Sequence, residues 1–429
     1  MINKKNLLVF PSESENSFEI FNALRFSTRF CIWGASSAEG HGQHVFENYY
    51  SKLPKINENN FIFEFNKFLE DKNISFIIAT HDDIAVFLSL HQNEIKAQLI
   101  GSKHSTADIC RHKKKLFSLL KNEDFCPTVF DNKSLVTEFP VFIKPDASQG
   151  SRDCHIVNSQ KDFDNIKIKN NETVICEYLP GQEITVDCFT DFDGEIQFIG
   201  PRTREKIKLG IAFQSTPLPV TEEISEIGKK LNELIKPRGI WFFQLKKDIK
   251  DKYKILEASC RPSTGMGIYR HIGVNLPLMA AYDALGIKTT ALKNKDFSIH
   301  TSKSLKNSYK HDLFYTHIYI DYDDTIIVNN QPNLSAIHFL YQSKLENKKI
   351  IILSRHDKDI YQSMKKNCIC PDLFDEIIIL EEHQKKSSFI QSQESIFIDN
   401  LFHERMEVLK NSDIPVFDVD AIDLLIKGQ

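Results

Sequence analysis

Short apolar runs alternate with stretches of helical periodicity over the first hundred residues. The runs at Leu7 to Phe10, Phe30 to Trp33 and Phe76 to Ala79 have the length and composition of strands. Between them, apolar residues recur at helical spacing over Phe18 to Phe26 and Ile62 to Leu69. This alternation predicts βαβ units around a parallel sheet.

Polar residues follow each of these predicted strands, at the carboxyl edge where open sheets bind ligands. After the third strand, Asp82 and Asp83 have two interpretations. They either line a ligand site at this edge or cap the helix predicted from Ile84 to Leu90.

A lysine followed by a small-residue turn comes next. The pattern from Thr106 to Leu120 predicts one lysine-rich helix, and the stretch FPVFIKPDASQGSR follows from Phe139 to Arg152. Lys144 ends an apolar strand there and supplies a point charge, and the small residues after it can turn backbone N–H groups towards anionic oxygens. The pattern is that of a polyphosphate site, and an ordinary turn has the same composition.

Carboxylates and basic residues then follow in a fixed order. TVICEY ends at Glu177 and Tyr178, and GQEITVDCF carries Glu183 and Asp187. A predicted hairpin, Trp241 to Lys247 and Tyr253 to Ala258, carries Gln244 and Glu257. Before the hairpin lie Arg202, Arg204 and Lys206, and after it lies Arg261.

In this order the motifs resemble the ATP-grasp superfamily, in its carbamoyl-phosphate-synthase-like and amino-acid-ligase-like branch, over about residues 1 to 290. The resemblance implies an α/β and α+β multidomain protein, with a Rossmann-like pre-ATP-grasp domain over 1–105 and a two-lobed ATP-grasp fold over 106–290. It also implies that ATP phosphorylates a small-molecule carboxylate and that an amine then displaces the phosphate.

The same resemblance assigns the nucleotide contacts. Lys113 and Lys144 would contact the phosphates of ATP or the adenine edge, and Glu183 would hold the ribose. The hinge that reads adenine through backbone groups would be Glu177, Tyr178 and Leu179. A lid over the phosphates would include Ser148, Gly150, Ser151 and Arg152.

It assigns the Mg²⁺ ligands as Glu257 and Gln244, with Mn²⁺ as the alternative ion. Family members often have a carboxylate at the position of Gln244 and an Asn at that of Ser259, so this chain carries less charge beside the metal. Arg261 would stabilise the transferring phosphoryl group, or form a structural salt bridge. Two further sets each have two open interpretations. Arg202, Arg204 and Lys206 either bind the acceptor or form a charged run on the surface. Ser263 to Gly267 form either an anion-binding loop or a plain turn.

A second α/β pattern begins after a polar stretch, residues 291–312, which we interpret as a linker. The strand Tyr315 to Ile320 continues into DYDDT, and later predicted strands end at Ser354 and Asp399. Asp321 and Asp323 are two residues apart and project to the same side. Asp399 can join them, and a divalent cation and a lysine are the usual neutralisers of such a cluster.

This constellation resembles the haloacid dehalogenase-like (HAD) phosphatase superfamily over about residues 313–429, which implies a HAD-like Rossmannoid domain. The short intervals between motifs predict a minimal cap or none. The resemblance makes Asp321 the nucleophile, Asp323 the general acid and then base, and Ser354 a ligand of the phosphoryl oxygens. Lys386, or alternatively Lys385, would steady the charge. The Mg²⁺ ligands would be Asp321, Asp323 and Asp399, with Asn400 where relatives often have a second acid.

The composition of the chain limits which binding partners and which cellular location are expected. The chain has 429 residues with 54 basic and 58 acidic side chains, a formal net charge of −4, so no global electrostatic attraction to nucleic acid or an anionic membrane is expected. Nine cysteines without a paired framework favour a reducing compartment, and Cys368 and Cys370 are predicted to be buried thiols. With no apolar segment near the roughly 20 residues of a membrane span, the expected location is cytoplasmic.

The leading hypothesis is a bifunctional enzyme, a carboxylate–amine ligase joined to a phosphatase that acts on a phosphorylated metabolite, either the substrate or the product of the ligase. One alternative makes the first module an ATP-grasp kinase or a carbamoyl-phosphate-type synthase. Another is a nucleotide-binding regulatory protein with a degenerate site, suggested by Gln244 and Ser259. A homodimer would follow the habit of this branch of the superfamily.

Overall fold

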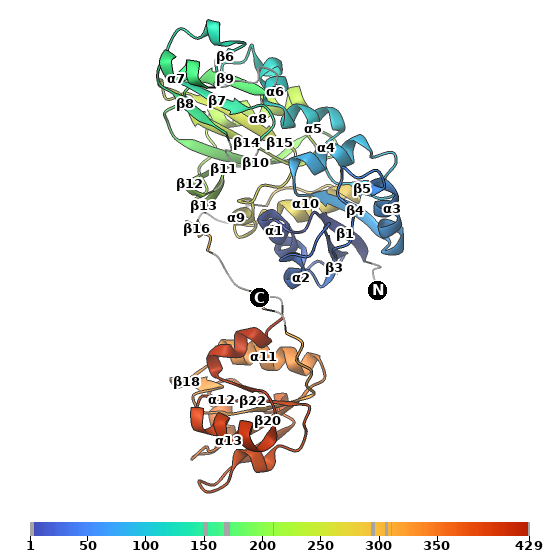
Figure 1. Ribbon diagram of the computed structural model, residues 1–429, viewed down its shortest axis with the longest axis vertical. Coiled ribbons are helices and arrows are strands. Elements are labelled where there is room, and N and C mark those ends of the chain that lie inside the picture. The colour runs from blue at the N-terminus through green and yellow to red at the C-terminus, as the bar shows by residue number, and fades with distance from the viewer. Residues whose placement is uncertain are drawn as a thin grey trace. The chain divides into compact units, whose positions relative to one another are not determined.

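The structure, a computed structural model, describes residues 4–148, 153–166, 172–208, 210–292, 297–304, 308–309 and 311–427. The chain forms two compact units, Met1–Leu305 and Lys306–Gln429 (Figure 1). The border between them falls inside the linker predicted for residues 291–312. The boundaries predicted at residues 105 and 290 stay predictions.

The first unit begins with a five-stranded parallel sheet in the order β3-β2-β1-β4-β5. Its strands are β1 (Lys5–Phe10), β2 (Phe30–Ala35), β3 (Asn48–Tyr50), β4 (Ile74–Ala79) and β5 (Gln98–Leu99). The helices here are α1 (Glu15–Leu24), α2 (Gly42–Val45), α3 (Phe61–Asp71) and α4 (Asp82–Leu90). Alternate residues of β1 enter two different core clusters, so both faces of the sheet are covered. The three strands and the parallel sheet predicted for this region are confirmed.

The single helix predicted from Thr106 to Leu120 is wrong. The structure has two helices, α5 (His104–Arg111) and α6 (Lys113–Leu120), separated at His112, whose backbone is extended (φ −106°, ψ 106°). Asp146 is the reason for the break: its carboxylate pairs with the His112 ring at 2.8 Å and accepts from the Lys114 amide at 2.7 Å. The break places Lys113 in the first turn of α6, with its side chain buried.

Two four-stranded antiparallel sheets follow, in the orders β6-β9-β7-β8 and β11-β10-β14-β15. The first contains β6 (Val129–Phe130), β7 (Val141–Pro145), β8 (His155–Val157) and β9 (Thr173–Glu177), with η1 (Lys133–Leu135) and α7 (Gln160–Asn165) between its strands. The second contains β10 (Glu183–Thr190), β11 (Ile196–Thr203), β14 (Gly239–Lys247) and β15 (Tyr253–Ser259), together with α8 (Glu222–Ile235), α9 (Gly267–Arg270) and α10 (Leu276–Ala284). The hairpin predicted from Trp241 to Ala258 is confirmed as β14–β15.

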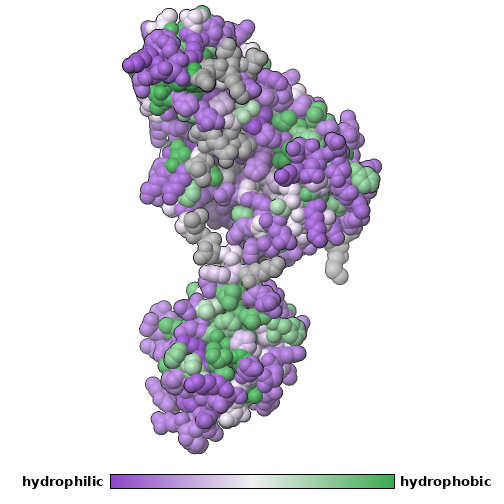
Figure 2. Space-filling model, viewed as in Figure 1, coloured by the Kyte–Doolittle hydropathy of each residue, from purple (hydrophilic) through white to green (hydrophobic). Residues whose placement is uncertain are grey.

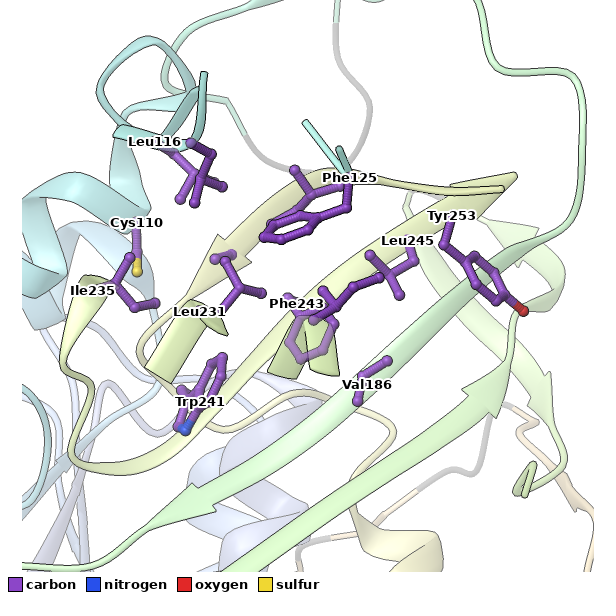
Figure 3. Packing of buried hydrophobic residues seen from close by; sticks show 14 of the residues in the cluster. Cys110, Leu116, Phe125, Val186, Leu231, Ile235, Trp241, Phe243, Leu245 and Tyr253 are labelled. Atoms are coloured by element: carbon purple, nitrogen blue, oxygen red, sulfur yellow. The ribbon is translucent and has the colours of Figure 1, made fainter. Parts of the chain in front are cut away.

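The core beneath the second of these sheets fixes which side chains of β14 point the other way. Trp241, Phe243 and Leu245 pack into one apolar cluster with Leu231 and Ile235 of α8 (Figure 3). Because side chains of a strand alternate between faces, the residues between them lie on the opposite side of the sheet. That side carries the candidate site.

Part of the predicted linker belongs to the first unit. β16 (Thr301–Ser302) pairs with β13 (Ile211–Ser215), which pairs with β12 (Glu205–Lys208). The Lys303 ammonium also donates to the Thr264 carbonyl at 2.6 Å. Low hydrophobicity suggested a linker here, whereas backbone pairing, which composition does not reveal, orders this stretch.

The second unit is built on a five-stranded parallel sheet in the order β21-β20-β17-β22-β23. Its strands are β17 (His317–Ile320), β20 (Lys349–Ser354), β21 (Glu376–Ile379), β22 (Ser395–Ile398) and β23 (Val416–Phe417). The remaining elements are β18 (Ile327–Val328), β19 (Gln331–Pro332), α11 (Leu334–Leu345), α12 (Ile360–Lys366), α13 (Phe402–Ser412), η2 (Pro371–Leu373), η3 (Lys386–Phe389) and η4 (Val419–Leu425). Only the β18–β19 hairpin and α11 separate β17 from β20, as the short interval predicted.

The two parallel sheets place their first strands, β1 and β17, at the centre. This is the arrangement of a doubly wound fold, in which ligands bind at the carboxyl ends of the strands. The visible face of the first unit is largely hydrophilic (Figure 2). Among the described residues no helix is long and apolar enough to cross a membrane. Cys368 and Cys370 are exposed, so the prediction that they are buried thiols is wrong: both lie in the surface turn between α12 and η2.

Candidate functional site

A cavity of about 140 Å³ in the first unit brings together many of the predicted nucleotide contacts. Residues from both antiparallel sheets and from α6 line it. The predicted site residues among them are Lys113, Lys144, Ser148, Glu177, Tyr178, Leu179, Glu183, Arg204, Gln244 and Glu257. Sequence positions as far apart as α6 and β15 therefore meet at one cavity.

Two lysine ammonium groups are buried beside this cavity. Lys144 donates to the Leu256 carbonyl at 2.8 Å and lies over the Phe117 ring, 5.0 Å from its centroid. Burial lowers the pKa of Lys144, with a further lowering from the charge of Lys113. Lys113 lies 3.6 Å from the Glu257 carboxylate. A polyanion bound here would restore the solvation that these two cations lose on burial.

The end of β9 also lines this cavity. The Glu177 carboxylate accepts from the Thr128 amide at 2.7 Å, so this side chain fixes the chain path at the predicted hinge. Glu183 forms an ion pair with Arg204 at 2.6 Å, and Arg204 also donates to the Gly210 carbonyl at 2.9 Å. The Glu183 carboxylate that lines the cavity is therefore already paired with the Arg204 guanidinium.

A second cavity, about 630 Å³ in volume, shares Lys113, Ser148, Arg204, Gln244 and Glu257 with the first. Gln244 and Glu257 are register partners on the neighbouring strands β14 and β15. Both residues therefore lie on the side of the sheet that the two cavities share. The larger cavity extends from there to the carboxyl end of the parallel sheet, where Ser14, Glu15, Asn16 and His81 line it.

Asp82 connects the parallel sheet to the metal-binding region predicted from the sequence. Its carboxylate accepts hydrogen bonds from the Ser259 hydroxyl and, at 3.0 Å, from Nε of Arg261. Burial alone would raise the pKa of Asp82, but the charge of Arg261 and these hydrogen bonds hold it below its usual value. Asp82 lines the larger cavity, whereas the N-cap of α4 is His81, so the structure favours the ligand-site interpretation over capping. Arg261 does form a salt bridge with Asp82.

The three basic residues predicted to bind the acceptor differ in their surroundings. Arg202 is buried, donates to Asp187 at 2.7 Å and also bonds the Ser263 hydroxyl, which itself donates to Asp187. Arg204 lines both cavities. Lys206 is exposed on β12, at positive φ (45°), and lines neither. The surface interpretation thus fits Lys206 alone.

Of the four residues that the sequence assigned to a lid, the structure describes Ser148. Ser148 lines both cavities, and its carbonyl accepts from Arg111 at 3.4 Å. Gly150, Ser151 and Arg152, which the sequence assigned to the lid, lie outside the described residues. Arg111 escaped the sequence analysis, although its place two residues before Lys113 in a basic stretch was a signal.

In the second unit one lysine lies between two of the predicted carboxylates. Lys386 Nζ donates to Asp321 at 2.7 Å and to Asp399 at 2.6 Å, and all three side chains are buried. Burial raises the pKa of Asp321 to about 6, although the charge of Lys386 acts in the opposite direction. Lys385, the alternative, is exposed on the rim of the cavity.

Asp321, Lys385 and Lys386 line a cavity of about 690 Å³, together with Asp323, Ser354 and Asn400. Ser354 is buried, and Thr325 accepts from the Asn400 amide at 3.2 Å and donates to Asp321 at 3.4 Å. Across the described ranges, no three His, Cys, Asp or Glu side chains are grouped closely enough to hold a metal ion by themselves. Lys386 occupies the position between Asp321 and Asp399 instead.

His356, which contacts the predicted general acid Asp323, was missed in the sequence analysis. Its Nδ1 lies 2.7 Å from Oδ2 of Asp323. The signal was a histidine two residues after Ser354, at the end of a strand of the same sheet.

Comparisons with solved structures show which fold this chain resembles. The biotin carboxylase of Campylobacter jejuni, solved as a beta-gamma-ATP complex, has a TM-score of 0.55 at 14% identity, over 67% of this chain and 72% of its own. The L-amino acid ligase of Bacillus licheniformis has a TM-score of 0.53 at 16% identity, over 66% of this chain and 75% of its own. The N5-carboxyaminoimidazole synthetase of Staphylococcus aureus, complexed with ADP, has a TM-score of 0.56 at 12% identity, over 68% of this chain and 79% of its own. At these identities the likeness shows the fold, which is ATP-grasp-like.

Within this unit, residues 169–305 match the model of a family described as ATP-grasp in the biosynthetic pathway with Ter operon. No curated protein matches the sequence.

Proposed function

We propose that the chain is an ATP-dependent carboxylate–amine ligase whose C-terminal unit is a Mg²⁺-dependent, HAD-type phosphomonoesterase. One observation supports the ligase above all: two buried lysines and the Gln244–Glu257 pair line one cavity, which shares six of its lining residues with a larger one. A nucleotide and a second substrate would meet at the junction of the two cavities.

In the smaller cavity, Lys113 and Lys144 hold the phosphates of ATP, and backbone groups of Glu177 to Leu179 bind adenine. Glu183 accepts from the ribose with the oxygen that Arg204 leaves available. Phosphoryl transfer needs orientation and charge neutralisation more than covalent participation, and buried cations supply both. Ser148 belongs to the lid, and Gly150, Ser151 and Arg152 complete it in this proposal.

Glu257 and Gln244 are the groups that would hold Mg²⁺. They fit this ion because Mg²⁺ uses one or two protein oxygens and fills its remaining positions with phosphates and water. When bound, Mg²⁺ neutralises charge on the phosphates. Gln244 and Glu257 are register partners, so both oxygens can face the same position.

In the larger cavity, a carboxylate oxygen of the acceptor attacks the γ-phosphorus of ATP, and ADP leaves. An amine then attacks the carbonyl carbon of the acyl phosphate, phosphate leaves and an amide forms. Arg261, fixed by Asp82, stabilises charge on the transferring group. Arg202 and Arg204 orient the acceptor, Arg202 through the Ser263 loop that it bonds.

In the second unit, Asp321 attacks the phosphorus of a phosphomonoester, and Asp323 gives its proton to the departing alkoxide. Asp323 then takes a proton from the water that hydrolyses the aspartyl phosphate. Ser354 donates to the phosphoryl oxygens, and Lys386 balances their charge. Asp321 and Asp399 would hold Mg²⁺ by their carboxylates and Asp323 by its backbone oxygen, with phosphate and water completing the shell. When bound, Mg²⁺ would neutralise charge at the phosphoryl group.

A single experiment tests both activities. ADP release is measured over a panel of carboxylates and amines for the wild type and for Asp321→Asn, with products identified by mass. The ligase predicts ADP formation that needs both a carboxylate and an amine, and the phosphatase predicts a phosphorylated species that accumulates only in the variant. If no substrate pair releases ADP above the ATP-only rate, the ligase proposal fails.

The same assay separates the alternatives. A phosphorylated product without an amide favours a kinase or a carbamoyl-phosphate-type synthase. Tight ATP binding without ADP formation favours a regulatory protein, the alternative suggested by Gln244 and Ser259. The bonded position of Ser259 beside Asp82 favours catalysis, because it gives this residue a role in fixing Arg261. The cytoplasmic location and the homodimer stay predictions.

A further inference from the structure

The general acid proposed for the phosphatase is the most exposed of its carboxylates. The side chain of Asp323 is 50% exposed, against 8% for Asp321 and 0% for Asp399. An exposed carboxylate samples several rotamers, and a general acid must lie within hydrogen-bond reach of the leaving oxygen. Something must therefore hold Asp323 in place.

His356 makes the contact that can do this. Nδ1 lies 2.7 Å from Oδ2 of Asp323, and since the partner is a carboxylate, the tautomer that forms this bond carries its proton on Nδ1. The imidazole side chain is 11% exposed. Its Nε2 is buried and makes no hydrogen bond with any part of the chain that the structure describes.

The imidazole is itself anchored. It packs edge-on against the Tyr322 ring, with centroids 5.3 Å apart and planes at 80°. Tyr322 is fully buried, and its hydroxyl donates to Ser363 of α12 at 2.9 Å. A continuous series of contacts thus runs from a helix through Tyr322 and His356 to the exposed acid.

We infer that His356 is a positioning residue that holds Asp323 where it protonates the leaving group, an inference that rests on the proposed phosphatase function. The Nδ1–H donates to Oδ2, so Oδ1 is the oxygen that carries the catalytic proton. As the P–O bond breaks, this proton passes to the leaving oxygen, and the Asp323 carboxylate that results keeps its bond to His356. No proton leaves the imidazole in this step.

The arrangement also selects a substrate class. An alkoxide is a poor leaving group and needs a positioned acid, whereas the carboxylate that leaves an acyl phosphate needs none. A held Asp323 is therefore useful on phosphate esters of alcohols. The substrate of this site belongs to that class, rather than to the acyl phosphates that the ligase would form.

The test uses the full chain with Mg²⁺ and three aryl esters of similar shape: 2,4-dinitrophenyl, p-nitrophenyl and phenyl phosphate. The dinitrophenolate leaves unaided, and phenolate leaves with help from an acid. His356→Ala should lower kcat for phenyl phosphate by roughly tenfold or more, a part of the ~10²–10⁴-fold that general acid catalysis supplies. The loss should shrink along the series and nearly vanish for the dinitrophenyl ester.

Three further variants sharpen the result. His356→Asn keeps an N–H donor near the position of Nδ1 and should restore most of the phenyl phosphate rate, whereas His356→Gln places its donor near Nε2 and should not. His338→Ala, an exposed histidine on α11, should leave all three rates unchanged. A loss of equal size on all three esters, or no loss, overturns the inference.

Failure of the proposed function gives a different pattern. If Asp321→Asn keeps the wild-type rates, or the wild type hydrolyses none of the esters, the phosphatase proposal fails and the role of His356 fails with it. If hydrolysis depends on Asp321 but the effect of His356→Ala does not depend on the leaving group, only the inference fails.

Discussion

Nε of Arg261 lies 3.0 Å from Oδ2 of Asp82, although 179 positions separate the two residues. Asp82 begins α4 at the carboxyl end of the parallel sheet, and Arg261 follows β15 of the antiparallel sheet. Asp82 also accepts a hydrogen bond from the Ser259 hydroxyl. Ser259 and Arg261, which both follow Glu257 in the chain, are therefore held by the same carboxylate. The pair joins two parts of the first unit at the wall of the larger cavity.

Asp82→Asn should destabilise the first unit at neutral pH by about 2 kcal/mol, the range for hydrogen bonds to charged groups. The folded pKa of Asp82 is lowered, so its contribution to stability is complete above the unfolded value of about 3.9 and is lost as the pH falls through the folded pKa. The difference in urea midpoint between wild type and variant should therefore shrink on acidification.

Asp83→Asn is the matched control for this measurement. Asp83 is the neighbouring residue and pairs with Arg111, but its side chain is 60% exposed. A pair of that exposure contributes at most about 1 kcal/mol. Equal midpoint changes for the two variants, at every pH, would contradict the role assigned to Asp82.

Lys144→Met should weaken ATP binding by about tenfold or more, which corresponds to about 1.4 kcal/mol. The ammonium is buried at the cavity and donates to a backbone carbonyl, and methionine keeps the volume without the charge. Titration calorimetry of the wild type and variant with Mg·ATP measures the change.

Lys121→Met removes an exposed lysine just beyond α6 and should leave the affinity unchanged. Because Lys144 is destabilised by burial in the absence of ligand, the variant should also be no less stable than the wild type in urea without ATP. Unchanged ATP affinity in Lys144→Met would place the nucleotide elsewhere.

Periodicity and motif order were sufficient to predict β1, β2 and β4 of the first sheet and the partners on the β14–β15 hairpin. Gln244 and Glu257 share a hairpin, and the spacing of residues across a hairpin is local, so their pairing follows from the sequence. The carboxylates of the second unit follow the ends of parallel strands, and parallel strand ends meet at one edge. Local rules thus carried these parts of the prediction.

The contacts that sequence could not give are those between distant segments. Asp146 breaks the predicted helix at His112, and nothing near His112 in the sequence announces it. Asp82 follows a strand and precedes a helix, so capping explained it equally well until Arg261 was placed beside it. Composition placed residues 301 and 302 in a linker because hydrogen bonding between backbones leaves no mark on composition.

Lys386→Met should abolish the phosphatase and make the second unit depend on Mg²⁺ for stability. Lys386 Nζ bonds Asp321 and Asp399, and without it two buried carboxylates repel each other. Mg²⁺ can then supply the missing charge. The expected result is a larger rise in unfolding temperature on adding Mg²⁺ for the variant than for the wild type, measured by calorimetry against EDTA.

Lys385→Met is the control, since Lys385 is the exposed neighbour. Its unfolding temperature should respond to Mg²⁺ as the wild type does. A Lys386→Met protein whose stability is indifferent to Mg²⁺ would show that Asp321 and Asp399 do not hold the metal.

Gly265→Ala should remove Arg202 from its position. A Cβ at residue 265 would overlap the guanidinium carbon of Arg202, so this side chain is the group that must move. Displacing it leaves Asp187, which is 0% exposed, as a buried carboxylate without its cation. The expected loss is about 3 kcal/mol in the free energy of unfolding, measured by urea denaturation, together with a higher KM for the acceptor.

Gly101→Ala makes the same chemical change where the new Cβ would meet only Leu99, at an ordinary 3.9 Å. Its effect on stability should stay within about 1 kcal/mol. The double variant Gly265→Ala with Asp187→Asn should lose less than the sum of the two single losses, because the second change removes the charge that the first leaves unpaired. Strict additivity would mean that the glycine matters for the loop itself, and that Arg202 keeps its place beside Asp187 when the alanine is introduced.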